Sequence, residues 1–194
     1  MRRIEFRKQS FPKNRRGIAI VWLILWGSIF LTFFCGFFEV ATLWQAQVEL
    51  NDSLDAAALA AVSEWKTQRD MSNFSTKIPR DVGIEYAAAN PVMGDTVSLG
   101  DNYDPGNSPN ENSLCSGNLV FGNLTSSGSD YDFNAGTSGG LLAVRAQATI
   151  PLYGFCNSLF GVTFLNVSAS STAFYDTGSG RPRLVRVTSY SCSD

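Results

Sequence analysis

The sequence predicts an α+β fold in which a long N-terminal helix packs on a small, mainly antiparallel β-sheet. Three observations predict this arrangement. An uncharged apolar run fills positions 17–38, a helical stripe of apolar residues follows it without Pro or Gly through Trp65, and stretches of alternating polarity occupy the C-terminal third. A chain of 194 residues is long enough for one domain besides such a helix.

The first sixteen residues form a basic arm. They contain seven Lys and Arg side chains and a single acid, Glu5, whereas the chain from Glu39 onward holds 16 acids and 8 bases. A basic arm can bind either nucleic acid or a membrane surface. The apolar run that follows the arm favours the membrane.

The run at 17–38 has the length and composition of a transmembrane helix. Its 22 residues would rise about 33 Å, which matches a hydrocarbon core of about 30 Å. Because Lys and Arg concentrate on the cytoplasmic side of such helices, residues 1–16 are predicted to be a cytoplasmic tail and residues 39–194 to lie across the membrane. A cleaved signal peptide would have a shorter apolar core and small residues at its cleavage site, so we expect the anchor to be retained.

The helix is predicted to continue outside the membrane over residues 39–66, because apolar residues still recur at steps of three and four. A second, less regular apolar strip could face a partner subunit, or both strips could be buried within this chain. Asp55 lies on the side of the second strip and is expected to be a solvated helix acid, since a buried carboxylate would need a partner. The first stripe holds Leu43, Ala46, Leu50, Leu54, Ala57, Ala61 and Trp65, and the second holds Trp44, Val48, Leu59 and Val62.

Residues 67–194 are predicted to form an exported α+β domain with a loop-rich middle at 92–140. Residues 66–80 are polar like a linker, and Asp81 is expected to cap a short helix that runs through Ala89. The apolar segment 152–161 is expected to form a helical turn or two, and 181–190 either a last edge strand or a loose tail. Strands are predicted at 96–99, at 118–124, at 142–150 with Pro151 as its end, and at 162–176 with the side of Val167 toward the core.

The residues needed for common catalytic sites are missing from the sequence. It contains no His, which excludes Ser-His and Cys-His catalysis and most zinc sites. It also lacks a CxxC pair, a phosphate-binding glycine loop and a nucleophile elbow. We therefore expect a protein that is not an enzyme, without catalytic residues, metal or cofactor, and without a nucleic acid or small-molecule substrate.

Four cysteines remain. Cys35 lies inside the apolar run and is expected to be unpaired. The other three are predicted to enter a compartment that permits disulfides. Cys156 lies in a short apolar segment, where a buried free thiol is expected, so the favoured disulfide joins Cys115 to Cys192.

Two stretches of the chain resemble one family. The first runs from the tripeptide RRG through the apolar span to an acidic residue, the aromatic Trp44, a Leu-Asn pair and the hexapeptide DAAALA. The second, AVRAQATIPLYGFCNSLFGVTFLNVSASSTA, covers residues 143–173. This ordered set resembles the TadG-like family of Flp/Tad (tight adherence) pilus-assembly proteins. The positions that match its motif are Arg15, Arg16, Gly17, Glu39, Leu50, Asp55, Ala56, Ala57, Ala58, Leu59 and Ala60.

The resemblance implies a membrane-anchored, non-enzymatic component of pilus assembly with a minor-pilin-like, anchoring or docking role. It also implies the bacterial cytoplasmic (inner) membrane as the location, and other pilus-assembly proteins or pilin subunits as partners besides the membrane. Pilins carry Glu at the fifth position after the processed Gly, where this chain has Trp22 after Gly17, which favours a permanent anchor. The alternative is a membrane-tethered extracytoplasmic binding or sensor domain unrelated to pili.

Overall fold

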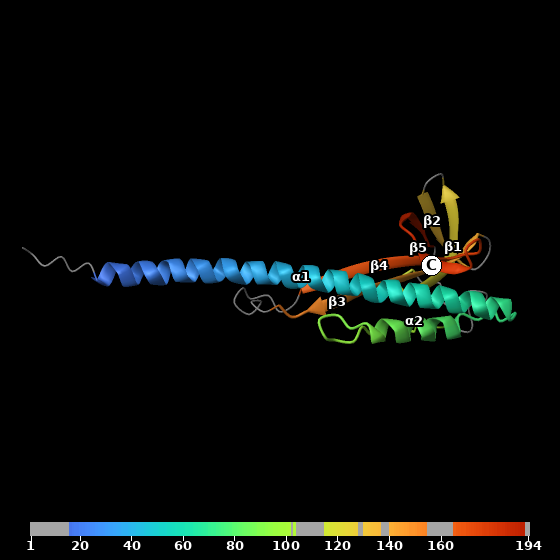
Figure 1. Cartoon of the computed structure of the whole chain (residues 1–194), viewed down its shortest axis with the longest axis horizontal. Coiled ribbons are helices and arrows are strands. Elements are labelled where there is room, and N and C mark those ends of the chain that lie inside the picture. The colour runs from blue at the N-terminus through green and yellow to red at the C-terminus, as the bar shows by residue number, and fades with distance from the viewer. Residues whose placement is uncertain are drawn as a thin grey trace, which may run out of the picture.

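A computed structural model describes residues 16–101, 103, 115–127, 130–136, 140–154 and 165–192. The first half of a very long helix protrudes from a small domain, and its second half lies beside a short helix on one face of a β-sheet (Figure 1). The predicted α+β fold is confirmed. The elements are α1 (Arg16–Asp70), α2 (Lys77–Ala89), β1 (Leu119–Ser127), β2 (Asp130–Ala135), β3 (Leu141–Leu152), β4 (Leu165–Asp176), β5 (Arg181–Leu184) and β6 (Val187–Ser191).

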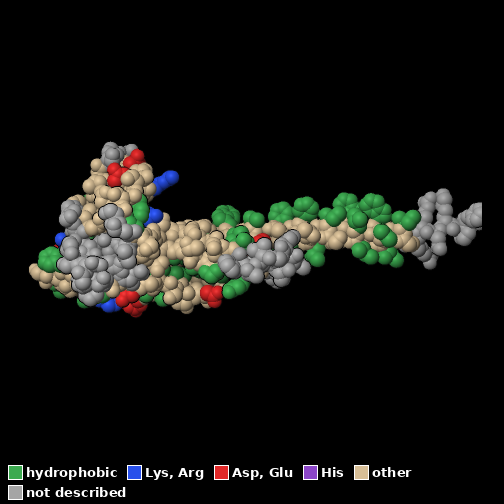
Figure 2. Space-filling view, turned by 180° about the vertical axis from the view of Figure 1, so that it is seen from behind, with side chains coloured by type: hydrophobic (Ala, Val, Ile, Leu, Met, Phe, Trp, Pro, Cys, Tyr) green, Lys and Arg blue, Asp and Glu red, His purple; other side chains and the backbone are tan. Residues whose placement is uncertain are grey.

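The protruding half of α1 is apolar and largely uncovered. Trp22, Phe30 and Phe37 are among the large hydrophobic side chains exposed along it. Figure 2 shows hydrophobic side chains along this segment, whereas acids and bases gather on the domain. This part of α1 is long and apolar enough to span a membrane.

The other half of α1 carries the core of the domain. The predicted stripe faces the sheet, and six of its seven members, from Ala46 to Trp65, are fully buried, while Leu43 is half-buried. Trp65 packs edge-to-face on Phe121 of β1 with ring centroids 5.0 Å apart. Aromatic pairs in this geometry add to the stabilisation from buried area, so this contact anchors the far end of α1 on the sheet.

The six strands have the order β5-β4-β3-β1-β2-β6, with all neighbours antiparallel except β2 and β6. β3 and β4 pair over twelve-residue strands, from Ala143–Phe174 to Leu152–Leu165. β1 pairs only with residues 141–146 of β3, so the rest of β3 and β4 extends as a two-stranded ribbon along α1. Pro151, expected to end the strand, lies within this ribbon. It is tolerated there because β3 has an open edge on the side that β1 leaves free.

The segment at 181–190 forms two strands rather than one. β5 extends one edge of the sheet and β6 extends the other, although only two residues separate them. The sheet must therefore curl until its edges approach each other, giving a half-barrel. A second hydrophobic cluster fills the curl; its fully or nearly buried members are Val120, Leu124, Phe133, Ala143 and Phe174.

α2 begins at Lys77, four residues before the predicted start at Asp81. Asp81 does not cap this helix. Its Oδ1 instead forms an ion pair with Nζ of Lys77, one turn earlier, at 2.5 Å. Pro79 fits because the first turn of a helix leaves its N–H groups without intrahelical partners. Arg80 is buried and ties α2 to β1, donating from Nη1 to the carbonyl oxygen of Leu119 at 2.6 Å.

The predicted strand at 96–99 does not form. Val97 and Leu99 are nevertheless almost fully buried in the main core, while Ser98 between them is exposed. The alternating pattern correctly indicated an extended segment with one buried side. It is not a strand because no neighbouring strand of the described residues pairs with it.

Cys115 and Cys192 form a disulfide, as the sequence favoured, with Cα atoms 5.7 Å apart and 77 positions of chain between them. Cys35 is also disulfide-bonded, so the expectation of an unpaired thiol was wrong. It is only 5% exposed, whereas most of the large side chains around it in the apolar run are exposed. Cys156 and the helical turn expected within 152–161 fall outside the described residues, apart from Leu152, Tyr153 and Gly154.

Candidate interaction surface

The hexapeptide DAAALA lies where three elements meet, and its two sides differ. On the inner side, Ala57 and the following Ala61 face Gly83 of α2. A Cβ on Gly83 would lie 3.1 Å from Ala61 Cβ, 3.3 Å from the Ala57 carbonyl oxygen and 3.0 Å from Leu119 Cδ1. The small residues thus permit a very close approach of the two helices. The buried hydroxyl of Ser53 donates across the same contact to the carbonyl oxygen of Ala87, at 3.2 Å.

The outer side of the hexapeptide forms a groove. Ala56, Leu59 and Ala60 are half-buried and lie on the face of α1 turned away from Ala57. Val82 and Tyr86 of α2 flank them on one side, and Pro182 of β5 on the other. The resulting cavity is open, mostly apolar and about 430 Å³ in volume; Ser63 and Glu64 complete its lining.

An exposed apolar strip leads from the protruding half of α1 toward this groove. Phe37, Val40, Trp44 and Val48 follow one another at steps of three and four, and their side chains are 75%, 66%, 74% and 47% exposed. Asp52 is exposed at the next position of the same row. The strip therefore crosses the point where the apolar run ends, and then meets a single acid before the groove.

The four residues expected to face a partner have different positions. Trp44 and Val48 are exposed and Leu59 is half-buried in the groove, but Val62 is fully buried in the core. Trp44 and Val62 are 18 residues, or about five helical turns, apart and thus face the same side of α1. They differ because, of the described strands, β3 and β4 alone accompany α1 near Trp44, whereas β5 is added to the sheet at the level of Val62.

Asp55 contributes to a second, polar groove of about 450 Å³ between α1 and the β4–β5 edge. Arg145 of β3 lies in it and donates from Nη2 to Ser170 Oγ at 2.9 Å and from Nε to Gln147 Oε1 at 3.2 Å. Its guanidinium also stacks 4.8 Å from the ring of Tyr190. Burial lowers the pKa of Arg145 from its usual value. Asp55 is half-buried beside these polar groups, so it is only partly the solvated acid that the sequence indicated.

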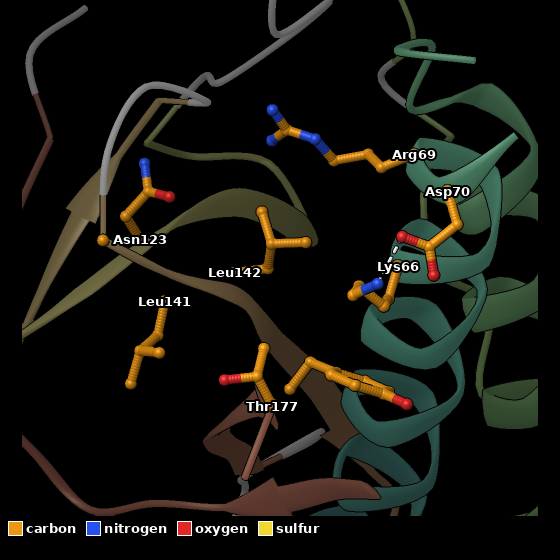
Figure 3. Close-up of a pocket in the computed structure, with 9 residues that line it drawn as sticks. Lys66, Arg69, Asp70, Asn123, Leu141, Leu142 and Thr177 are labelled. Carbon is orange, nitrogen blue, oxygen red and sulfur yellow. Dashed lines mark hydrogen bonds and ion pairs between the residues drawn. The ribbon is translucent and has the colours of Figure 1, made fainter. Parts of the chain in front are cut away.

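A third pocket, of about 420 Å³, lies at the end of α1 far from the protruding half (Figure 3). Lys66, Arg69 and Asp70 face it from the helix, opposite Leu141 and Leu142 of the sheet. Its cations already have partners. Lys66 pairs with Asp70, and the Arg69 guanidinium stacks on the rings of Trp65 and Phe74. This neutralisation makes the pocket a poor site for a charged ligand.

A further polar contact fixes the turn after α2 to α1. Glu49 accepts hydrogen bonds from the backbone N–H of Met93 at 2.6 Å and from Gln45 Nε2 at 2.8 Å. These two hydrogen bonds, the Met93 bond foremost, lower the pKa of Glu49 below its ordinary value. The ionised form of Glu49 therefore stabilises this turn.

The remaining motif positions are scattered along α1. Arg15 falls outside the described residues, and α1 begins at Arg16. Gly17 has open space around it, Glu39 is half-buried and Leu50 is fully buried in the core. Among the described residues, no three His, Cys, Asp or Glu side chains are grouped in a way that could hold a metal ion.

The sequence did not indicate which residues flank the apolar groove over Ala56, Leu59 and Ala60. One signal was available, since a Gly within a predicted helix often marks a close backbone approach, and Gly83 does so here.

No family model, curated protein or solved structure matches this chain.

Proposed function

We propose that this protein is a membrane-anchored, non-enzymatic docking component of Flp/Tad-type pilus assembly. One observation carries the proposal: the DAAALA hexapeptide that motivated the resemblance forms the floor of an exposed apolar groove. Its inner alanines are required for packing against α2. Of its outer residues, Ala56 and Ala60 face the groove and are not part of the core, while Leu59 lines the groove and also packs against the edge of the core.

In this proposal the basic tail lies in the cytoplasm, α1 crosses the bacterial inner membrane, and the domain lies on the far side. The groove then takes a helix of a partner subunit that emerges from the same membrane. Such a helix would bury Trp44 and Val48 on its way to the groove, and the small residues of the groove floor would allow close backbone contact. A Lys or Arg of the partner would be needed opposite Asp52.

A second copy of this chain is the less suitable occupant. Two copies anchored in one membrane have parallel α1 helices, and a two-fold contact along this face would place Asp52 against Asp52. The groove also lies between α2 and β5, whose side chains Tyr86 and Pro182 flank its floor. A slender helix fits between them better than another α1 that carries its own domain.

Site-specific photo-crosslinking in cells tests the docking surface. We expect a crosslinker at Val48 or Ala56 to capture a membrane-anchored pilus-assembly or pilin subunit. A crosslinker at Phe74, which is 60% exposed at the opposite end of the domain, serves as the matched control. Equal capture from all three positions, or none from Val48 and Ala56, would contradict the proposed surface.

Gene deletion tests the proposed process. Loss of surface pili is expected, with recovery by the intact gene and not by a variant in which Ala56 and Ala60 are both replaced by Glu. Both side chains face the groove and not the core, so the variant should still fold. Unchanged piliation in the deletion strain would argue for the alternative, a membrane-tethered binding or sensor domain.

A further inference from the structure

The β3–β4 ribbon runs along α1 toward its protruding half. One hydrogen bond fixes their relative height, because Gln47 Nε2 donates to the carbonyl oxygen of Ser168 at 3.1 Å. At the other end of β4, the Tyr175 ring lies 5.7 Å from Lys66 Nζ. β4 and α1 therefore run in the same direction. A position along β4 can be expressed as a position along the axis of α1.

This conversion places the end of the ribbon level with the end of the apolar run. Gln47 is eight residues beyond Glu39, which is a rise of about 12 Å along α1. Leu165 lies three strand positions before Ser168, or about 10 Å back toward Glu39. Leu165 pairs with Leu152, and Tyr153 is one position further. Tyr153 therefore lies within about one helical turn of the height of Glu39.

The side chains at this height are aromatic and uncovered. Tyr153 is 81% exposed and Trp44 is 74% exposed, and they come from different elements. Tyrosine and tryptophan are enriched at the depth of lipid headgroups, where the ring meets apolar chains and the polar group meets water. The headgroup layer is about 5–8 Å thick on each side of the bilayer, so Tyr153, which is level with Glu39, falls within it, whereas Trp44 lies five residues further from the membrane.

Cys35 provides a second, independent observation. It lies one helical turn inside the apolar run from Glu39, yet it is 5% exposed and disulfide-bonded, while Phe34 and Phe37 beside it are 48% and 75% exposed. A disulfide forms only where the compartment is oxidising. Cys35 is therefore shielded from lipid, although it lies within the apolar run. The 18 residues 17–34 remain, and about 27 Å of helix is close to the thickness of the hydrocarbon core.

We propose that the end of the β3–β4 ribbon rests in the headgroup layer, so that the domain is seated on the lipid surface and not held above it. The occupant of this surface is the bilayer itself, and Tyr153 is the side chain that contacts it. The inference rests on the proposed membrane anchoring by α1. It does not depend on the docking groove or on a role in pili.

Depth-dependent fluorescence quenching tests the inference with the full chain in lipid vesicles that contain brominated phosphatidylcholine. The native tryptophans at 22, 26 and 44 are replaced by Phe, while Trp65 is kept because it is fully buried in the core and would give a constant signal. Three reporters are then compared: Trp26 restored, Tyr153→Trp, and Phe74→Trp. Tyr153 and Phe74 are both exposed, so their replacement should leave the fold unchanged.

We expect shallow bromines to quench Tyr153→Trp several-fold more than Phe74→Trp, and deep bromines to quench Trp26 most. If Tyr153→Trp is quenched no more than Phe74→Trp while Trp26 is quenched, the domain is not seated on lipid, although the anchor stands. If Trp26 is also unquenched, α1 does not enter the bilayer, and both the inference and the proposed anchoring fail. The vesicles contain no other protein, so a partner protein cannot shield Tyr153→Trp from the bromines and cause a lack of quenching.

Discussion

Replacement of Gly83 measures the close contact between α1 and α2. An alanine there would gain about 1 kcal/mol of helix propensity over glycine. Its Cβ, however, would meet Ala61 Cβ at 3.1 Å and the Ala57 carbonyl oxygen at 3.3 Å, and neither atom can rotate away. Overpacking of this kind costs about 1–3 kcal/mol, so Gly83→Ala should be destabilising by about 0–2 kcal/mol. Gly83→Val adds two more methyl groups and should be destabilising by about 3 kcal/mol.

The assay is urea unfolding of the full chain in mild detergent, followed by circular dichroism. Glu85→Val provides a matched control, because Glu85 is exposed on the same helix and should lose only about 0.5 kcal/mol of helix propensity. Ala61→Gly removes one of the crowded atoms but itself costs about 1 kcal/mol of helix propensity, so combined with Gly83→Ala it should be less destabilising than the sum of the two single variants by about 1 kcal/mol. If Gly83→Val is as stable as Glu85→Val, or if the effects of Ala61→Gly and Gly83→Ala are additive, the close contact does not exist as described.

Three further outcomes are expected. Val62→Ala should lower the free energy of unfolding by about 2 kcal/mol, whereas Trp44→Ala, on the same side of α1, should change it by less than about 0.5 kcal/mol in urea titrations; equal effects would contradict the difference in burial. The lowered pKa of Glu49 stabilises the fold above its ordinary pKa, and this stabilisation is lost as the pH falls through the lowered value. Unfolding midpoints of Glu49→Gln and of the wild type should therefore differ at pH 7 and converge below about pH 4.5, and a constant difference would refute the assignment. Cys115→Ser should cost up to about 4 kcal/mol in the same titration under non-reducing conditions, because the bridge closes a long loop; an unchanged midpoint would refute this role.

Local patterns predicted most of the helical half of the fold. The stripe from Leu43 to Trp65 is regular because one continuous core face requires it, and the structure buries it as expected. The sequence could not show how far around α1 the sheet reaches. The reach of the sheet around α1 determines that Val62 is buried in the core and Trp44 is exposed. It depends on the order of the strands and not on the sequence of the helix.

The sheet was harder to predict for the same reason. Residues 96–99 alternate like a strand, but strand formation also requires a partner, and pairing is a property of the whole fold. The segment 181–190 reads as one stretch, while Val185 and Arg186 carry the chain from one edge of the sheet to the other. Of the proposed docking surface, Trp44, Val48 and Leu59 could be predicted from periodicity. Tyr86 and Pro182 come from distant segments, and only the packed structure brings them to the groove.

The two strands at 181–191 have a consequence for how the protein is made. A chain is synthesised from its N-terminus, so β4 and β2 both lack their outer neighbours until these last strands are made. During that interval the half-finished sheet offers two open edges to other chains. Maturation of the domain is thus a single late event, and a nascent chain halted before residue 181 would be a substrate for chaperones and proteases instead of a shorter working version.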